Sequence, residues 1–579
     1  MKIETFEFNV NGINEISKNI KGKNWPVVYM LHNKTDLYIG ETTSAKNRIE
    51  QHLNSSDKKY LKEVNIVFDD LYNKSVVLDF EQKLIKYFKS DGKFENILNK
   101  NTGQSALHEY YNRDNYYDEF KKLWNKLVSL NLANHKVDLL ENLNIFKFSP
   151  YTYLTEEQNE VSYQVINDIY KKLTNKETGY SLVNGCAGTG KTVLAISMIN
   201  SLVNAINLDE SLLNEDDYLD EKIKALLLIK NYVKENGKLK IGFVFPMQGI
   251  RKTIATVFDK CGNGLTKEMV INPYQVKNMD YDILFVDEAH RLSRRKNIVN
   301  YYDFDETCKY YGLNKEDSNQ LDFIMKASKY KVLFYDVDQS VKGSDIKHFD
   351  FLNTLKKYDK CGSCHMLETQ MRCIGGRQYT DYIKNIFNCN CKESEIINNY
   401  DFKIFDNVDV MINKIRKLDK EYGLCRNVAG YSWKWNSKSK KKYKDNLDAY
   451  NNLVSKEIYD IEIQGHKYLW NLTDEDWISR KDSIYTIGCI HTTQGFDLNY
   501  VGVIFGHEID YNPKTNNIEV YKSKFYDANV KNAVSEEEFK KYIINTYITM
   551  MARGIKGCYV YACNENLKKY LKQFIEIEE

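Results

Sequence analysis

Short apolar runs, separated by segments with helical spacing, dominate the chain from about residue 148 onward. Each run is four to eight residues long, and the clearest are YSLVNG, IGFVFP, YDILFVDE, KVLFYD, IYTIGCIH and YVGVIFG. Continuous apolar runs of this length are typical of strands buried on both faces of a parallel sheet. The pattern therefore predicts a large α/β region, with helices covering parallel sheets.

The N-terminal part of the chain follows a finer pattern. Between residues 25 and 100, VVYML and LYIGE predict a hairpin, VNIVF predicts a further strand, and helices begin near Ser44 and Lys74. We expect a small α/β domain over residues 1–105. Residues 106–147 are polar and aromatic with helical spacing, which predicts a helical connector.

Composition narrows the classes of function. The 82 Lys and Arg nearly balance the 80 Asp and Glu, giving a net charge of +2. A globally basic nucleic-acid-binding chain is thereby excluded, and any nucleic-acid contact must be local. The start has no signal-peptide pattern, no run of 18 apolar residues occurs, and the 12 Cys are scattered. We expect a cytoplasmic protein with reduced thiols and no membrane segment.

A phosphate-binding loop is the sharpest local signal. GCAGTGKT follows one of the apolar runs and precedes the helical run TVLAISMINSLV. The backbone N–H groups of such a loop surround phosphate oxygens at the start of a helix. Lys191 would reach the β- and γ-phosphates, and the Thr192 hydroxyl would bind Mg²⁺. The other expected ATP-binding residues of the loop are Gly185, Gly188, Thr189 and Gly190.

Two adjacent carboxylates form the partner motif. The run YDILFVDEAH delivers Asp287 and Glu288 to the end of a predicted strand, about 95 residues after the loop. Phosphoryl transfer needs a carboxylate that holds Mg²⁺ and another group that orients the attacking water. We expect Asp287 to take the first role and Glu288 the second.

These motifs resemble motifs I and II of superfamily 1 helicases, and the closest resemblance is to Schlafen-type helicase domains. Further motifs follow in the family's order: LTEEQ with Gln158, FYDVDQS with Gln339, ETQMRC with Arg372, IHTTQGFDLNYVGVIFG with Gln494 and Gly495, and YITMMARGIKG with Arg553. The resemblance covers about residues 148–579. It implies that Gln158 reads adenine, Gln339 senses the γ-phosphate, and Arg372 and Arg553 act as arginine fingers. It also implies two RecA-like lobes, residues 148–360 and 361–579, that close on one ATP.

A carboxylate within an apolar stripe marks the small N-terminal domain. Glu81 shares a predicted helix face with Val77, Leu84, Ile85 and Phe88. A carboxylate in such a place is unfavourable unless it is paired or binds a metal. The alternative is a Glu at the edge of the stripe that reaches solvent.

Tyr29, Tyr38, Arg48 and Glu81 together resemble the GIY-YIG nuclease family over about residues 24–105. The first motif is VVY instead of GIY, whereas YIG is unchanged. The resemblance implies that Glu81 holds Mg²⁺ or Mn²⁺, that Tyr29 helps to activate water, and that Arg48 stabilises the charge of the transition state. The family's late asparagine is Asn96, Asn99 or Asn101, of which we prefer Asn99.

Two basic segments and a set of cysteines give weaker indications of function. The Lys-rich run 434–444 beside Trp433 and Trp435, and the basic segment HRLSRRK (290–296), are either solvated surface or nucleic-acid contacts. For Cys361, Cys364, His365, Cys389 and Cys391 we expect free thiols rather than zinc, because the second cysteine pair is spaced by one residue.

The sequence thus predicts a nuclease joined to an ATP-driven helicase or translocase that acts on nucleic acid. We favour DNA over RNA as the substrate and phage defence as the role. A repair or recombination enzyme, an ATP-gated sensor whose nuclease-like module does not cut, and an RNA-directed Schlafen-like enzyme are the alternatives. The oligomeric state is left open.

Overall fold

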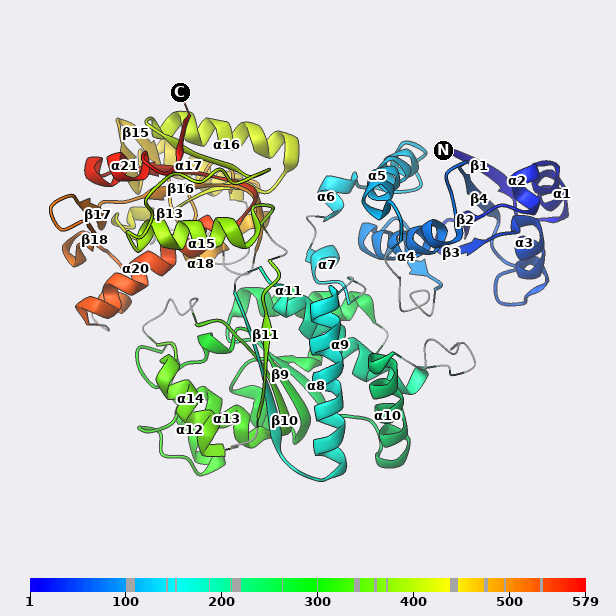
Figure 1. Cartoon of the computed structure of the whole chain (residues 1–579), viewed down its shortest axis with the longest axis horizontal. Helices are drawn as coiled ribbons and strands as arrows, with labels where there is room; N and C mark the ends of the chain where they lie inside the picture. Colours follow the sequence, from blue (N-terminus) through cyan, green and yellow to red (C-terminus); the bar gives the residue numbers. More distant parts are fainter. Residues whose placement is uncertain are drawn as a thin grey trace. The chain divides into compact units, whose positions relative to one another are not determined.

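The computed structural model describes the chain except residues 100–109, 142–143, 151, 153, 187, 209, 211–219, 263, 299, 338–343, 359–361, 371–372, 438–445, 473–476, 494–495, 532–534 and 579. The chain forms two compact units, Met1–Tyr153 and Leu154–Glu579 (Figure 1). Within the described residues, no helix has the length and apolar character needed to cross a membrane.

A mixed sheet in the order β1-β4-β2-β3-β5 is the centre of the first unit. Its neighbours are antiparallel, except that β3 and β5 run parallel. The central strand β2 is buried along its whole length, as the apolar run predicts. The elements are β1 (Lys2–Glu7), α1 (Val10–Lys18), α2 (Ile20–Lys23), β2 (Val27–His32), β3 (Asp36–Thr42), α3 (Ala45–Asn54), β4 (Glu63–Phe68), α4 (Lys74–Asp91), β5 (Asn96–Ile97), α5 (Arg113–Ser129), α6 (Val137–Glu141) and α7 (Asn144–Lys147).

The helices expected as a connector pack on α4. Phe120 and Trp124 of α5 are fully buried in one cluster with Phe80, Tyr87 and Phe88 of α4. Ring pairs such as Tyr87 and Trp124, with centroids 5.0 Å apart, join the two helices. The described part of residues 106–147 thus belongs to the core of the first unit, because α4 exposes aromatic surface that the sheet alone does not cover.

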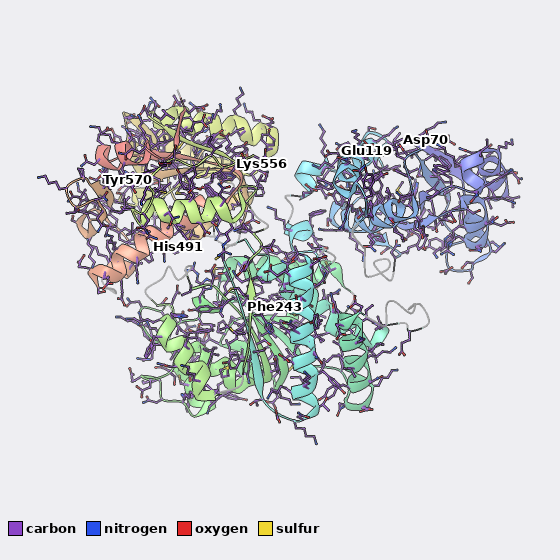
Figure 2. All side chains as sticks on the ribbon, in the orientation of Figure 1. Asp70, Glu119, Phe243, His491, Lys556 and Tyr570 are labelled. Atoms are coloured by element: carbon purple, nitrogen blue, oxygen red, sulfur yellow. The ribbon has the colours of Figure 1, made fainter. Side chains whose placement is uncertain are left out.

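The second unit begins with a lobe built on a parallel six-stranded sheet in the order β11-β6-β10-β9-β7-β8. In the view of Figure 1, α8, α9 and α10 lie on one side of the strands, and α12, α13 and α14 on the other. Phe243 of β7 is fully buried in this lobe (Figure 2). Its elements are α8 (Glu156–Thr174), β6 (Gly179–Gly185), α9 (Lys191–Asn204), α10 (Glu221–Asn236), β7 (Ile241–Val244), α11 (Gln248–Cys261), β8 (Val270–Ile271), β9 (Tyr281–Val286), α12 (Tyr301–Tyr311), α13 (Gln320–Ala327), β10 (Ser328–Tyr335), α14 (His348–Tyr358) and β11 (Ser363–Leu367).

A second lobe has its own parallel sheet, in the order β13-β16-β19-β12-β20. Tyr570 of α21 packs in its core (Figure 2). The elements are α15 (Gly376–Phe387), β12 (Asp401–Phe405), α16 (Val408–Tyr422), β13 (Cys425–Ala429), α17 (Asn446–Ser455), β14 (Ile461–Ile463), β15 (His466–Tyr468), α18 (Ile490–Thr493), β16 (Leu498–Phe505), β17 (Ile509–Asn512), β18 (Asn517–Val520), α19 (Ala528–Lys531), α20 (Glu536–Met551), β19 (Gly554–Ala562), α21 (Glu565–Leu571) and β20 (Glu576–Glu578).

The α/β fold with a small N-terminal domain and two parallel-sheet lobes is confirmed, but two details differ from expectation. β11, expected in the second lobe, pairs in parallel with β6 and so belongs to the first sheet. The apolar run IYTIGCIH forms no strand: Ile487 and Gly488 make only isolated bridges before α18 begins. The run is buried because Trp477 packs on Gly488, so burial without a ladder explains its apolar character.

Candidate functional sites

The phosphate-binding loop joins β6 to α9 with its lysine turned inward. Gly188 and Gly190 have φ of 89° and 75°, which only glycine adopts without strain. The buried Lys191 Nζ donates to the carbonyl oxygens of Gly185 (2.5 Å) and Cys186 (2.9 Å). It also lies 3.6 Å from Asp336 Oδ2, a carboxylate after β10 that sequence analysis missed within the FYDVDQS motif. The lysine is thus poised over the loop that would receive the phosphates.

The two carboxylates after β9 meet the loop at its helix. Thr192 Oγ1 donates to Asp287 Oδ2 over 2.6 Å, which places together the hydroxyl and carboxylate oxygens that Mg²⁺ prefers. Burial, and then the charge of Glu288, raises the pKa of Asp287 above its ordinary value, although Lys191 opposes the shift. A divalent cation would stabilise two adjacent buried carboxylates in their ionised forms. The residues present fit Mg²⁺.

Glu288 is held in an unusual backbone conformation. Its φ is 52°, in the left-handed region that non-glycine residues rarely adopt and that is often found at functional sites. Burial opposes its ionisation, but the contact with His290, whose Nε2 lies 2.8 Å from Glu288 Oε2, holds the pKa of Glu288 below its ordinary value. Glu288 is thus an ionised, oriented carboxylate beside Asp287.

Gln158 contacts the loop from α8. Its Oε1 accepts from Thr155 N (3.0 Å) in a capping box, and its Nε2 donates to Thr189 O (2.9 Å). In this arrangement the amide connects the start of α8 to the phosphate-binding loop. Its expected role in reading adenine stays a prediction.

The remaining expected helicase residues lie mostly outside the described residues: Gln339, Arg372, Gln494 and Gly495. Arg553 is described, between α20 and β19. Its guanidinium is buried, and Nη1 donates to Phe496 O over 3.5 Å. A buried arginine at the carboxyl end of a helix is compatible with a finger, and that role stays a prediction.

In the first unit, Tyr29 and Tyr38 converge on a histidine that sequence analysis missed. Tyr29 Oη and His52 Nε2 form a hydrogen bond of 2.8 Å, and the centres of the Tyr38 and His52 rings lie 5.1 Å apart. Lys58 Nζ lies 3.4 Å from His52 Nδ1 and 4.0 Å from the centre of the Tyr38 ring. The detectable signal was spacing: His52 follows Arg48 by four residues on α3, one helical turn later.

Burial sets the protonation of this cluster. It raises the pKa of Tyr29 well above 10. Burial, followed by the charges of Lys58 and Arg48, lowers the pKa of His52 to about 4. His52 is therefore neutral at physiological pH, and its contact with Tyr29 is a hydrogen bond between two neutral groups.

Gly40 of the YIG motif makes room for Tyr29. The two residues are partners in the β2–β3 ladder. A Cβ on Gly40 would lie 2.3 Å from Tyr29 Oη and 2.4 Å from Tyr29 Cζ. The glycine is needed because the tyrosine ring crosses the neighbouring strand at this point.

Glu81 lies on α4, mostly buried. Burial, and then the charge of Glu41, raises the pKa of Glu81 to about 7. Lys74 and Arg48 oppose this shift, and Lys74 forms an ion pair with Glu41. A carboxylate whose ionisation is unfavourable because of burial would be stabilised by a divalent cation, so Glu81 fits the role of a metal ligand.

Asn99 clamps the strand that carries YIG. Its Oδ1 accepts from Ile39 N (3.0 Å) and its Nδ2 donates to Ile39 O (2.8 Å). This arrangement supports a positioning role rather than contact with a substrate. Asn96 instead donates to Asp36 (2.8 Å), and Asn101 lies outside the described residues.

Two arginines of the basic segment 290–296 form ion pairs within the lobe, and contact of this segment with nucleic acid stays a prediction. Arg291 Nη1 pairs with Asp345 Oδ2 over 3.2 Å, with both side chains at most 2% exposed. Arg295 Nε pairs with Asp305 over 2.7 Å. These arginines stabilise the fold around the carboxylate strand.

Trp435 and His365, which the sequence analysis also singled out, contact other residues of this chain. Trp435 Nε1 donates to Ser437 and its ring packs on Trp470, whereas residues 438–445 of the Lys-rich run lie outside the described residues. His365 contacts Gln164 and Ser363 through its ring nitrogens, and Cys361 is not described. No group of three or more His, Cys, Asp or Glu gathers as a metal site in the described part of the chain.

Comparison with known families and proteins gives two family matches and one relative. Residues 179–564 match the family "Schlafen group 3, DNA/RNA helicase domain", and residues 26–96 match "GIY-YIG catalytic domain". The uncharacterized protein YPL245W of Saccharomyces cerevisiae is 26% identical over 460 residues, which are 72% of this chain and 90% of the yeast protein.

Two solved helicase structures are also similar. The structure of Pif1 helicase from Candida albicans covers 73% of this chain and 99% of its own, at 10% identity and a TM-score of 0.26. A structure of two coordinating Pif1 helicases unwinding forked double-stranded DNA covers 72% and 94%, at 11% identity and a TM-score of 0.25. Scores this low support no conclusion about function.

Proposed function

The chain belongs to the Schlafen group 3 DNA/RNA helicase family and carries a GIY-YIG catalytic domain, and on that premise we propose that it is an ATP-driven motor that moves on DNA and cuts it with Mg²⁺ or Mn²⁺. We place it in the cytoplasm and assign its role to defence against phage. The observation that carries the proposal is the 2.6 Å contact of Thr192 with Asp287, beside the inward-turned Lys191.

In the ATP site, each residue has a separate task. Mg²⁺ held by Thr192 and Asp287 would neutralise phosphate charge. Lys191 exchanges its carbonyl partners for phosphate oxygens, because a charged donor binds an anion more strongly than a neutral carbonyl. Glu288 orients the attacking water. Arg372 and Arg553 add positive charge at the γ-phosphate, where negative charge develops in the transition state.

Tyr29 is the residue that would meet the attacking water in the nuclease site. Its Oη would orient the water and help to activate it, and the 2.8 Å contact with His52 Nε2 holds the phenol in place. Arg48 stabilises charge on the phosphate. Glu81 would hold the cation, which polarises the phosphate when bound. Tyr38 and Lys58 keep the imidazole in place.

Purified protein incubated with labelled single- and double-stranded DNA and RNA, with and without ATP and Mg²⁺, tests the proposal. Faster cleavage of DNA than RNA, and DNA-stimulated ATP hydrolysis, are expected. Cleavage of RNA alone would favour the RNA-directed alternative. Binding without cleavage at any metal concentration would favour the ATP-gated sensor. A phage challenge separates defence from repair, because a repair enzyme should instead protect cells from DNA damage.

A further inference from the structure

The segment that leaves the first lobe starts beside the phosphate-binding loop. β11 ends at Leu367, which pairs with Gly185 at the end of β6. A Cβ on Gly185 would lie 3.1 Å from Leu367 Cβ, so the two backbones approach closely. The chain then continues as the crossover segment, residues 368–374, of which 371–372 are not described.

One carboxylate holds the start of this segment. Glu157, in the first turn of α8, accepts from Glu368 N (2.7 Å) through Oε1 and from Thr369 N (3.1 Å) through Oε2. Burial opposes its ionisation, but these two N–H donors keep the pKa of Glu157 below its ordinary value. Hydrogen bonds to an ionised acceptor are the stronger kind, so this is a firm anchor.

The neighbouring residue on α8, Gln158, contacts the phosphate-binding loop. Gln158 Nε2 donates to Thr189 O (2.9 Å), and Thr189 in turn contacts Cys186 O (3.0 Å). The first turn of α8 therefore contacts both the phosphate-binding loop and the crossover segment. If nucleotide binding shifts the loop, the shift can reach the crossover segment through the first turn of α8, which a capping box holds.

The far end of the crossover segment meets the second lobe near its expected arginine finger. Ile374 N donates to Ile555 O over 2.9 Å. Ile555 follows Arg553 by two residues on β19. The segment is thus bonded to the first lobe at one end and to the strand after Arg553 at the other.

We propose that Glu157 is a positioning residue that couples the nucleotide state of the phosphate-binding loop to the second lobe by anchoring the crossover segment. The proposal rests on the proposed ATPase function. Both carboxylate oxygens of Glu157 accept hydrogen bonds from the crossover segment. Its loss should leave ATP affinity nearly intact and slow the hydrolysis that needs both lobes.

Three variants of the full chain test this. Glu157→Ala removes both acceptors, and Glu157→Gln keeps one. Glu156→Ala is the matched control, because Glu156 is an exposed carboxylate in the same helix turn. We expect kcat for nucleic-acid-stimulated hydrolysis to fall roughly tenfold in Glu157→Ala and less in Glu157→Gln, with KM for ATP changed less than about twofold. Glu156→Ala should match the wild type.

Hydrogen exchange of the peptide around residues 366–370 gives a readout independent of turnover. The Glu368 and Thr369 amides should exchange roughly tenfold faster in Glu157→Ala, with unchanged melting temperature. A nucleotide analogue should alter their exchange in the wild type but not in Glu157→Ala. Glu157→Ala behaving like Glu156→Ala in both assays would overturn the proposal. Should the wild type hydrolyse no ATP, the proposed function fails, and the exchange response to the bound analogue still decides the coupling.

Discussion

The proposed ATP site and the proposed nuclease site would both bring cations and donors to a phosphate, yet they are assembled differently. Most of the ATP site lies in the contiguous loop 185–192, whose backbone supplies donors, with Asp287 and Glu288 at the end of a nearby parallel strand. The nuclease site takes one side chain each from β2, β3 and α4 and two from α3. A contiguous site tolerates shifts of the surrounding packing, whereas a dispersed site depends on register and on space between elements.

The two sites also differ in how burial acts on their key groups. In the ATP site Lys191 is buried but already has carbonyl partners. In the nuclease site, burial raises the pKa of Glu81 to about 7 and lowers that of His52 to about 4. Burial also raises the pKa of Asp287 in the ATP site, so both sites should respond to metal, and the nuclease site should respond more to acid because it also contains His52.

The largest effect should come from Lys191→Ala. Removing the cation that would bind the phosphates should lower ATP hydrolysis more than about 10³-fold. Nuclease cleavage of short DNA without ATP should persist, because the two sites share no residue. An unchanged rate of ATP hydrolysis would refute the assignment of the loop.

Arg553→Ala should come next. A finger acts on charge that appears late in the reaction, so hydrolysis should fall about 10³-fold while ATP affinity changes little. Nucleotide binding measured by calorimetry, beside steady-state turnover, separates the two quantities. Equal losses of binding and turnover would indicate a structural role for this buried arginine instead.

Glu81→Gln tests the nuclease site in the way that Lys191→Ala tests the ATP site. The amide keeps the shape of the side chain but binds a cation weakly, so metal-dependent cleavage should fall about 10²- to 10³-fold. ATP hydrolysis should be retained, because the motor has its own Mg²⁺ ligands in Thr192 and Asp287. Cleavage at the wild-type rate would place the nuclease site elsewhere.

His52→Gln should reduce cleavage by about 10²-fold, because Tyr29 loses the ring that holds it. It should also make cleavage less sensitive to acid, because the residue that becomes protonated at low pH is gone. The pKa of His52 lies at about 4 in the fold against 6.5 for an ordinary histidine. Protonation therefore opposes folding, so the stability contributed by the neutral ring is complete above pH 6.5 and is lost as the pH falls toward 4.

Thermal melting between pH 4 and 7.5 checks this. The wild type should lose stability over that interval relative to His52→Gln, and Lys58→Met should lessen the difference by removing a neighbouring positive charge. Parallel pH profiles for all three proteins would contradict the assigned cause.

Gly40→Ala should give the smallest effect, roughly tenfold on cleavage with about 1–3 kcal/mol of destabilisation. The added methyl would meet the Tyr29 ring at 2.3–2.4 Å and displace it from His52. In a Tyr29→Ala background the same substitution should be nearly neutral for stability. The same loss in both backgrounds would show that the ring is not the obstacle.

Several residues were predictable because their signal is local. The loop 185–192, the pair Asp287 and Glu288, and the YIG segment of β3 are each contiguous, so spacing alone identifies them. The family and the α/β fold followed from these motifs and are confirmed. His52 and Asp336 were missed because a lone His or Asp carries no signal until the fold brings it within reach of Tyr29 or Lys191.

What the sequence determined by itself was where the phosphate-binding loop and most strands lie, since these depend on runs of neighbouring residues, although the run IYTIGCIH forms no strand. Only the tertiary structure decided which polar groups are paired within the fold and which strands belong to which sheet. It pairs Arg291 with Asp345, ties Asn99 to Ile39, and assigns β11 to the first sheet. Such choices depend on contacts between residues far apart in the chain, where burial makes an unpaired charge or a lost hydrogen bond unfavourable.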